Sequence, residues 1–180
     1  MNPLKRVFFV ICALAVLLGS AFLAYQVLQP LGPDETPELA EDVEPLLDFA
    51  AETQEGDAVY FSDFIHQPMV ALFWTSWCGA CKLGMEVLDV LYEQVGDEVQ
   101  ILAVNLSTLG HRELIHGREF MEASDFSFSS IYDINGEAAR LYGVNAVPIM
   151  LFIGADGGIH HQHVGIMSMD GMLEVIEQLG

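Results

Sequence analysis

The chain has 180 residues, of which 52% are hydrophobic, and it carries 26 acidic against six basic side chains for a formal net charge of −20. This length accommodates one domain of ordinary size with an appendage. The strong negative charge argues against nucleic acid and anionic lipid as partners, because their phosphates repel an acidic surface.

Residues 1–29 are predicted to form a signal anchor. Lys5 and Arg6 precede residues 7–28, a stretch without any charged side chain. A helix of this length spans a bilayer, and the basic residues before it orient the N-terminus towards the cytoplasm. We therefore expect one transmembrane helix in a bacterial inner membrane, with the rest of the chain in the periplasm or another extracytoplasmic space. The alternative is a signal peptide cleaved near residues 19–21.

Residues 30–55 are predicted to form an acidic linker. Proline, glycine and acidic residues dominate positions 30–37, a composition typical of spacers. Apolar residues then recur at helical spacing between positions 39 and 50, but Pro45 interrupts the pattern. We therefore expect a short helix that starts near Glu44 or Pro45.

Residues 56–180 have the alternating pattern of an α/β domain. The apolar run 69–74 predicts a strand buried on both faces, and apolar residues at every fourth position from Leu83 to Val95 predict a helix after it. Further strands are expected at 58–61, 100–105, 149–153 and 159–164, with an extended segment at 127–132 and helices ending near 142 and 180. Residues 106–117 are expected to be irregular, and 119–124 to be the end of a helix. This order predicts a central mixed sheet of four or five strands flanked by helices.

Cys78 and Cys81 lie where the buried strand leads into the helix. The free N–H groups and the dipole of a first helical turn favour a thiolate, so we expect a lowered pKa at Cys78. Cys81 is close enough to close a disulfide, and an attacking and a resolving thiol are what thiol-disulfide exchange requires. A structural zinc site needs a second pair of ligands at suitable spacing, which the sequence lacks. The third cysteine, Cys12, falls within the anchor.

Residues 73–82 (FWTSWCGACK) resemble the active-site segment of the thioredoxin superfamily, most closely that of its membrane-anchored TlpA-like and cytochrome c maturation-type members. Residues 138–148 resemble the helix, turn and cis-proline loop of the same fold. The resemblance covers about 58–180 and implies a thioredoxin-like fold. It also implies that Val147 and Pro148 lie against the cysteine pair and offer backbone groups to an extended substrate.

The residues around the two cysteines have expected roles as well. Trp77 is expected to shield the pair and shape a docking surface, and Gly79 and Ala80 form the turn between the cysteines. Thioredoxins carry a buried carboxylate six residues before the first cysteine, where this chain has Leu72. Some anchored relatives carry a glutamate three residues after the second cysteine, where this chain has Gly84. Water, or at best Glu86 among the side chains, is then expected to deprotonate Cys81.

We predict that the protein is an enzyme, a thiol-disulfide oxidoreductase that reduces protein disulfides without a bound cofactor. We expect a membrane-embedded electron donor to reduce its cysteine pair again after each cycle. An oxidising disulfide donor or isomerase is one alternative. A copper-binding assembly protein on the thioredoxin fold is another, because His161 and His163 share a strand face beside His160. Surface histidines on an edge strand are the simpler interpretation of this cluster.

Overall fold

The computed structural model describes residues 44–179. The expected transmembrane helix and the alternative cleavage site both lie outside this range. Within the described residues, no helix has the length and apolar character needed to cross a membrane.

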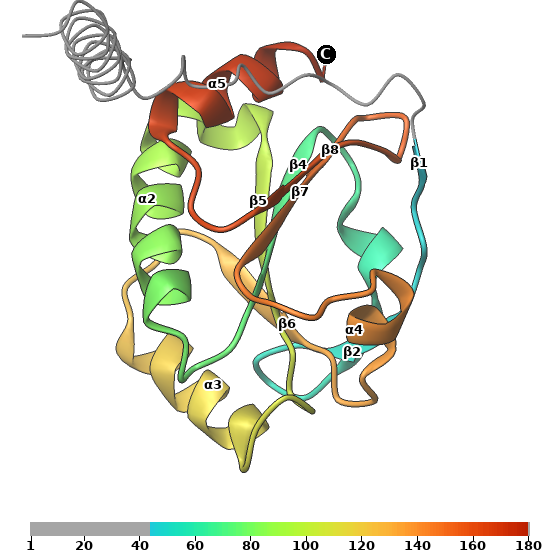
Figure 1. Ribbon diagram of the computed structural model, residues 1–180, viewed down its shortest axis with the longest axis vertical. Coiled ribbons are helices and arrows are strands. Elements are labelled where there is room, and N and C mark those ends of the chain that lie inside the picture. Colours follow the sequence, from blue (N-terminus) through green and yellow to red (C-terminus); the bar gives the residue numbers. More distant parts are fainter. Residues whose placement is uncertain (1–43, 180) are drawn as a thin grey trace, which may run out of the picture. The chain divides into compact units, whose positions relative to one another are not determined.

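A mixed sheet of eight strands forms the centre of the domain, in the order β1-β8-β7-β4-β5-β6-β2-β3 (Figure 1). Strands β4, β5 and β6 are parallel, whereas β7 is antiparallel to β4 and β8 is antiparallel to β7. The strands are β1 Glu44–Pro45, β2 Ala50–Glu52, β3 Ala58–Tyr60, β4 Met69–Trp74, β5 Gln100–Asn105, β6 Ser129–Tyr132, β7 Ile149–Ile153 and β8 Gly158–Val164.

Helices cover both faces of this sheet. They are η1 Phe61–Phe64, α2 Gly79–Val95, η2 Gly96–Glu98, α3 Glu113–Ala123, α4 Glu137–Leu141 and α5 Met169–Glu177. One hydrophobic cluster joins the sheet to α2 and α5, and a second joins it to η1 and α4. All six residues of β4 are buried, because its alternate side chains enter the two clusters in turn. The unbroken apolar run in the sequence is therefore a consequence of this two-sided cover.

The prediction of four or five strands is wrong, because short strands extend both edges of the predicted centre. β1 pairs with β8 at one edge, and β2 joins β6 and β3 at the other. The helix expected from Glu44 or Pro45 is absent, and β1 and β2 occupy this stretch instead. Phe49 lies between them and is buried in the second cluster, where it stacks on Phe61. Pairing with distant strands thus overrides a local helical spacing.

Helix α3 also differs from its predicted position. We expected only the end of a helix at residues 119–124 and an irregular stretch over 106–117. Instead α3 begins at Glu113, directly after Arg112, whose φ of 59° is left-handed. The extra turn brings Glu113 into the protein interior, where only 1% of it is exposed.

Candidate active site

The cysteine pair lies at the N-terminus of α2. Cys78 is the N-cap residue of this helix and forms a disulfide with Cys81, with 5.3 Å between their Cα atoms. The backbone N–H of Cys81 donates to the Cys78 sulfur at 3.0 Å. Cys78 keeps 7% of its surface exposed, whereas Cys81 is fully buried. The arrangement therefore gives the two cysteines unequal access to solvent, with Cys78 the outer member.

The loop before β7 lies against the outer cysteine. The Val147–Pro148 peptide bond is cis, as the resemblance implied. The carbonyl oxygen of Val147 lies 3.8 Å from the Cys78 sulfur. The backbone N–H of Gly165 donates to the Pro148 carbonyl at 2.9 Å, which ties the loop to the end of β8. A backbone acceptor is thus held beside the more exposed sulfur of the pair.

Exposed side chains surround the pair. Trp77 is 62% exposed, and its indole Nε1 donates to the Leu109 carbonyl at 3.2 Å. A Cβ atom at Gly110 would lie 3.0 Å from this nitrogen, so any larger residue there would push the indole away from the loop. Gly79 and Ala80 are exposed, as the turn between the cysteines requires. Trp77 therefore contributes to an accessible surface beside Cys78, while its shielding of the pair stays a prediction.

A buried polar cluster supports the turn before Cys78, and the sequence did not identify it. Glu113 accepts hydrogen bonds from the Ser76 backbone N–H at 2.5 Å, the Ser76 hydroxyl at 2.7 Å and the Asn105 amide at 2.8 Å. A Cβ atom at Gly117 would lie 2.7 Å from the same amide, so α3 can approach Asn105 only with glycine there. The helical spacing of Glu113, Gly117 and Met121 was the signal that could have revealed this face.

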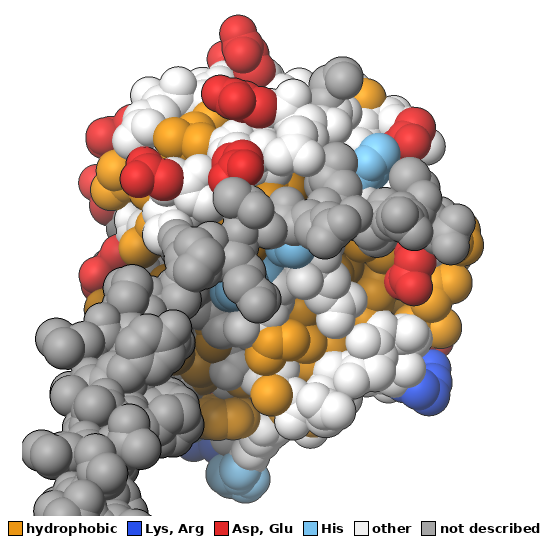
Figure 2. Space-filling view, turned by 45° about the horizontal axis from the view of Figure 1, so that its top comes forward, with side chains coloured by type: hydrophobic (Ala, Val, Ile, Leu, Met, Phe, Trp, Pro, Cys, Tyr) orange, Lys and Arg blue, Asp and Glu red, His pale blue; other side chains and the backbone are white. Residues whose placement is uncertain are grey.

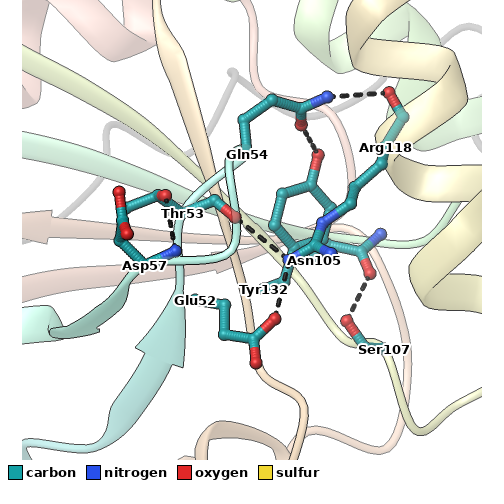
Figure 3. A network of polar contacts seen from close by, with 8 residues as sticks. All are labelled: Glu52, Thr53, Gln54, Asp57, Asn105, Ser107, Arg118 and Tyr132. Atoms are coloured by element: carbon teal, nitrogen blue, oxygen red, sulfur yellow. Dashed lines mark hydrogen bonds and ion pairs between the residues drawn. The ribbon is translucent and has the colours of Figure 1, made fainter.

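A second network lies next to this cluster. Figure 3 shows Asn105 with the hydroxyl of Ser107, beside Tyr132 and the Arg118 side chain. Arg118 reaches from α3 to Glu52 on β2 and so connects the helix with the edge of the sheet.

The positions at which relatives carry a carboxylate are apolar in this structure. Leu72 is fully buried, and a Cβ atom at Gly84 would lie 3.7 Å from the Met150 methyl and 3.9 Å from a Leu72 methyl. Glu86 is exposed on α2, where it lines a surface groove of about 680 Å³ with Ile166. Its part in deprotonating Cys81 stays a prediction.

The histidines of β8 have separate environments. His160 lies 3.2 Å from the Asp156 carboxylate, and the ring of His161 lies 5.6 Å from that of Phe152. His163 is opposite Met150 in the ladder, so His161 and His163 do share a face of the strand. Within residues 44–179, no three side chains of His, Cys, Asp or Glu are grouped so that they could hold a metal ion.

The surface is strongly acidic. In the view of Figure 2, acidic side chains are frequent and basic ones are sparse. The only lysine and arginine residues after position 6 are Lys82, Arg112, Arg118 and Arg140.

Comparison with known proteins relates this site to a family and to several relatives. A model of the AhpC/TSA family matches residues 43–162. The chain is 27% identical over 169 residues to the thiol-disulfide oxidoreductase ResA of Oceanobacillus iheyensis. The matched region covers 92% of this chain and 86% of that protein. It is 25% identical over 142 residues to sporulation thiol-disulfide oxidoreductase A of Bacillus subtilis, covering 77% and 85%.

Solved structures agree in fold. A protein from Chlorobium tepidum described as a DsbE-type thiol:disulfide interchange protein superposes with a TM-score of 0.66 and 26% identity, covering 78% of this chain and all but 1% of that one. A DsbF homologue from Corynebacterium diphtheriae superposes with a TM-score of 0.67 at 20% identity, covering 83% and 97%. The second likeness concerns the thioredoxin-like fold alone.

Proposed function

Because this chain belongs to the AhpC/TSA family and is a thiol-disulfide oxidoreductase, we propose that it reduces protein disulfides outside the cytoplasm while anchored in the membrane, as TlpA-like and cytochrome c maturation-type proteins do. One observation carries this proposal. The Cys78 sulfur caps a helix N-terminus and lies 3.8 Å from the backbone oxygen of a cis-proline loop. The sulfur proposed to react and the backbone group proposed to bind the peptide are thus neighbours.

The exchange uses only the two cysteines. The Cys78 thiolate attacks one sulfur of the substrate disulfide, bonds to it and releases the other substrate sulfur as a thiolate, which takes up a proton. Cys81 then loses its proton and attacks the Cys78 sulfur, which frees the second substrate sulfur. Two electrons have passed to the substrate, and the Cys78–Cys81 disulfide remains. The two sulfurs carry both electrons, so we propose no bound cofactor.

Unequal burial supports this division of roles. Cys78 retains 7% exposure and Cys81 none, so an incoming protein disulfide meets Cys78 first. The N–H of Cys81 already donates to the Cys78 sulfur, and the same donor stabilises a thiolate at this position. Burial of Cys81 restricts its attack to the sulfur of Cys78, once Cys78 is bonded to the substrate.

The substrate is an extended protein segment that carries a disulfide. The Val147 carbonyl offers it a hydrogen-bond acceptor, and an exposed apolar surface surrounds the site. Trp77, which precedes Cys78, is 62% exposed, and Leu83 on α2 and Val164 on β8 are 54% and 59% exposed, so apolar side chains are available for a docking surface.

The N-terminal sequence supports the location. Lys5 and Arg6 before the uncharged stretch 7–28 orient the domain away from the cytoplasm. A pair that reduces substrates there must be reduced again after each cycle, so we propose a membrane-embedded electron donor as partner. The acidic surface fits neither nucleic acid nor anionic lipid headgroups.

Cysteine variants of the full chain test the exchange. Cys78→Ser should abolish reduction of a protein disulfide such as that of insulin. Cys81→Ser should accumulate a mixed disulfide between Cys78 and the substrate, visible as a mass increase that dithiothreitol removes. Cys12→Ser is the control and should keep full activity. Full turnover by either active-site variant would exclude the mechanism.

The reduction potential of the pair tests the direction of exchange. A value near that of thioredoxin, about −270 mV, fits a reductant. A value near about −120 mV would identify an oxidising disulfide donor or isomerase instead.

A further inference from the structure

The buried carboxylate of Glu113 contacts the turn that leads into the cysteine pair, and the exchange chemistry above does not use it. Only 1% of Glu113 is exposed. Its Oε1 accepts from the Ser76 N–H at 2.5 Å and from the Asn105 amide at 2.8 Å, and its Oε2 accepts from the Ser76 hydroxyl at 2.7 Å. Ser76 stands two residues before Cys78, so the carboxylate is bonded to the segment that carries the attacking sulfur.

This carboxylate has neutral donors and no cation among its described partners. The described residues form two ion pairs, Arg118 with Glu52 and His160 with Asp156, and neither includes Glu113. Arg112, its neighbour in sequence, is exposed. A buried charge held by neutral donors is weakly screened, so its field extends to nearby groups.

We propose that Glu113 is a positioning residue that acts on Cys78 through Ser76 and keeps the cysteine pair reducing. Its hydrogen bonds hold the turn in place, and its negative charge disfavours the Cys78 thiolate. The thiolate exists only in the reduced form, so the charge shifts the equilibrium towards the disulfide and makes the pair a stronger electron donor. This inference rests on the redox function proposed above.

The size of the effect follows from the geometry. Two residues of extended chain span at most about 7 Å between Cα atoms, and with the 2.5 Å contact at Ser76 and the Cys78 side chain this puts the carboxylate within about 14 Å of the Cys78 sulfur. At an effective permittivity of about 20, a unit charge at that limit changes an ionisation equilibrium by about sevenfold, and by more at a shorter distance. Partial screening at the protein surface lowers this factor, so we expect a change of roughly three- to tenfold.

Glu113→Gln tests the charge, because glutamine keeps the length and one acceptor oxygen. In the full chain held in detergent, thiolate absorbance should show a roughly three- to tenfold larger acid constant for Cys78. Glutathione buffers, at a pH where Cys78 is ionised in both proteins, should show the variant to be a weaker reductant by the same factor, about 15 to 30 mV. Glu119→Gln, an exposed position on the same helix, is the matched control and should change neither quantity.

A measurement on the unaltered protein covers the case in which the glutamine variant does not fold. Coupling between two sites is reciprocal, so the ¹³C resonance of the Glu113 carboxyl should shift at the pH where Cys78 of the reduced protein ionises. The proposal would be overturned if folded Glu113→Gln had an unchanged or more reducing potential. It would also be overturned if the Glu113 resonance did not shift when Cys78 ionises. If the unaltered protein has no reversible Cys78–Cys81 couple at all, the redox function itself is wrong.

Discussion

Replacing Arg118 by methionine tests how firmly the β2–β3 hairpin is held to α3. The Arg118 guanidinium makes three contacts in the network of Figure 3. Its Nη2 lies 2.7 Å from the Glu52 carboxylate and donates to the Thr53 carbonyl at 3.1 Å, and its central carbon lies 5.0 Å from the centroid of the Tyr132 ring. Methionine keeps an apolar stem of similar length and removes all three contacts.

The expected loss is about 2 kcal/mol. The Arg118 and Glu52 side chains are 27% and 28% exposed, so their ion pair contributes about 0.5–1 kcal/mol. The hydrogen bond to Thr53 adds about 1 kcal/mol and the contact with the Tyr132 ring about 0.5–1 kcal/mol. The contacts share one guanidinium and are not additive, and the retained stem offsets part of the loss, so the lower end of the sum applies.

Urea unfolding of the protein from residue 30 onward measures this loss. Glu52→Gln alone should cost about 1 kcal/mol, and the cycle of both single variants and the double variant should give a coupling of about 0.5–1 kcal/mol. Arg140→Met, at an exposed position on α4, is the control and should cost less than about 0.5 kcal/mol. An Arg118→Met variant as stable as the control, or zero coupling with Glu52, would refute this reading of the network.

Three further predictions concern the site and the ionisable core. Gly110→Ala should displace the Trp77 indole and slow disulfide reduction about fivefold, which insulin turnover and indole fluorescence would detect; unchanged kinetics would contradict it. Burial raises the pKa of Asp133 in the folded protein above 3.8, so the fold favours the protonated carboxyl. The stability of the protein relative to that of Asp133→Asn should therefore rise as the pH falls towards 3.8, and a stability difference that does not change with pH would contradict this. Burial raises the pKa of Tyr132 and of Tyr142 to about 12, whereas both phenols ionise near 10.0 in the unfolded chain, so the stability of the fold should decrease as the pH rises from 10.0 to about 12. An absorbance titration in which all tyrosines ionise together near 10.0 would rule this out.

The centre of the sheet and the redox pair could be predicted from sequence because their signals are local. The expected strands 69–74, 100–105 and 149–153 coincide with β4, β5 and β7. Each is covered on both faces, which requires a short run of apolar residues that periodicity and length identify in the sequence. The Cys78–Cys81 pair and Pro148 can likewise be recognised from the few residues that surround each of them.

The parts that could not be predicted depend on contacts distant in sequence. The stretch 44–52 has helical spacing, yet its backbone pairs with β8, β3 and β6, and Tyr142 bonds both the N–H and the carbonyl of Leu47. The N-terminus of α3 has no side-chain cap, and Arg112 precedes it in a conformation that few residues other than glycine adopt. No capping residue therefore marked Glu113 as the start of a helix, and only its spacing from Gly117 and Met121 indicated a buried face.

These two unpredicted parts are physically connected, and the connection leads to the cysteine pair. The β2–β3 hairpin contacts α3 through Glu52 and Arg118, and the Arg118 guanidinium lies over the ring of Tyr132, the residue paired with Asn105 in the sheet. Asn105 in turn bonds Glu113, which holds the turn before Cys78. Tyr132, Asn105 and Glu113 are buried, and buried polar groups are stable only when each has its partner, so a defect at one of them disturbs the next. The β2–β3 hairpin therefore belongs to the structural support of the redox site.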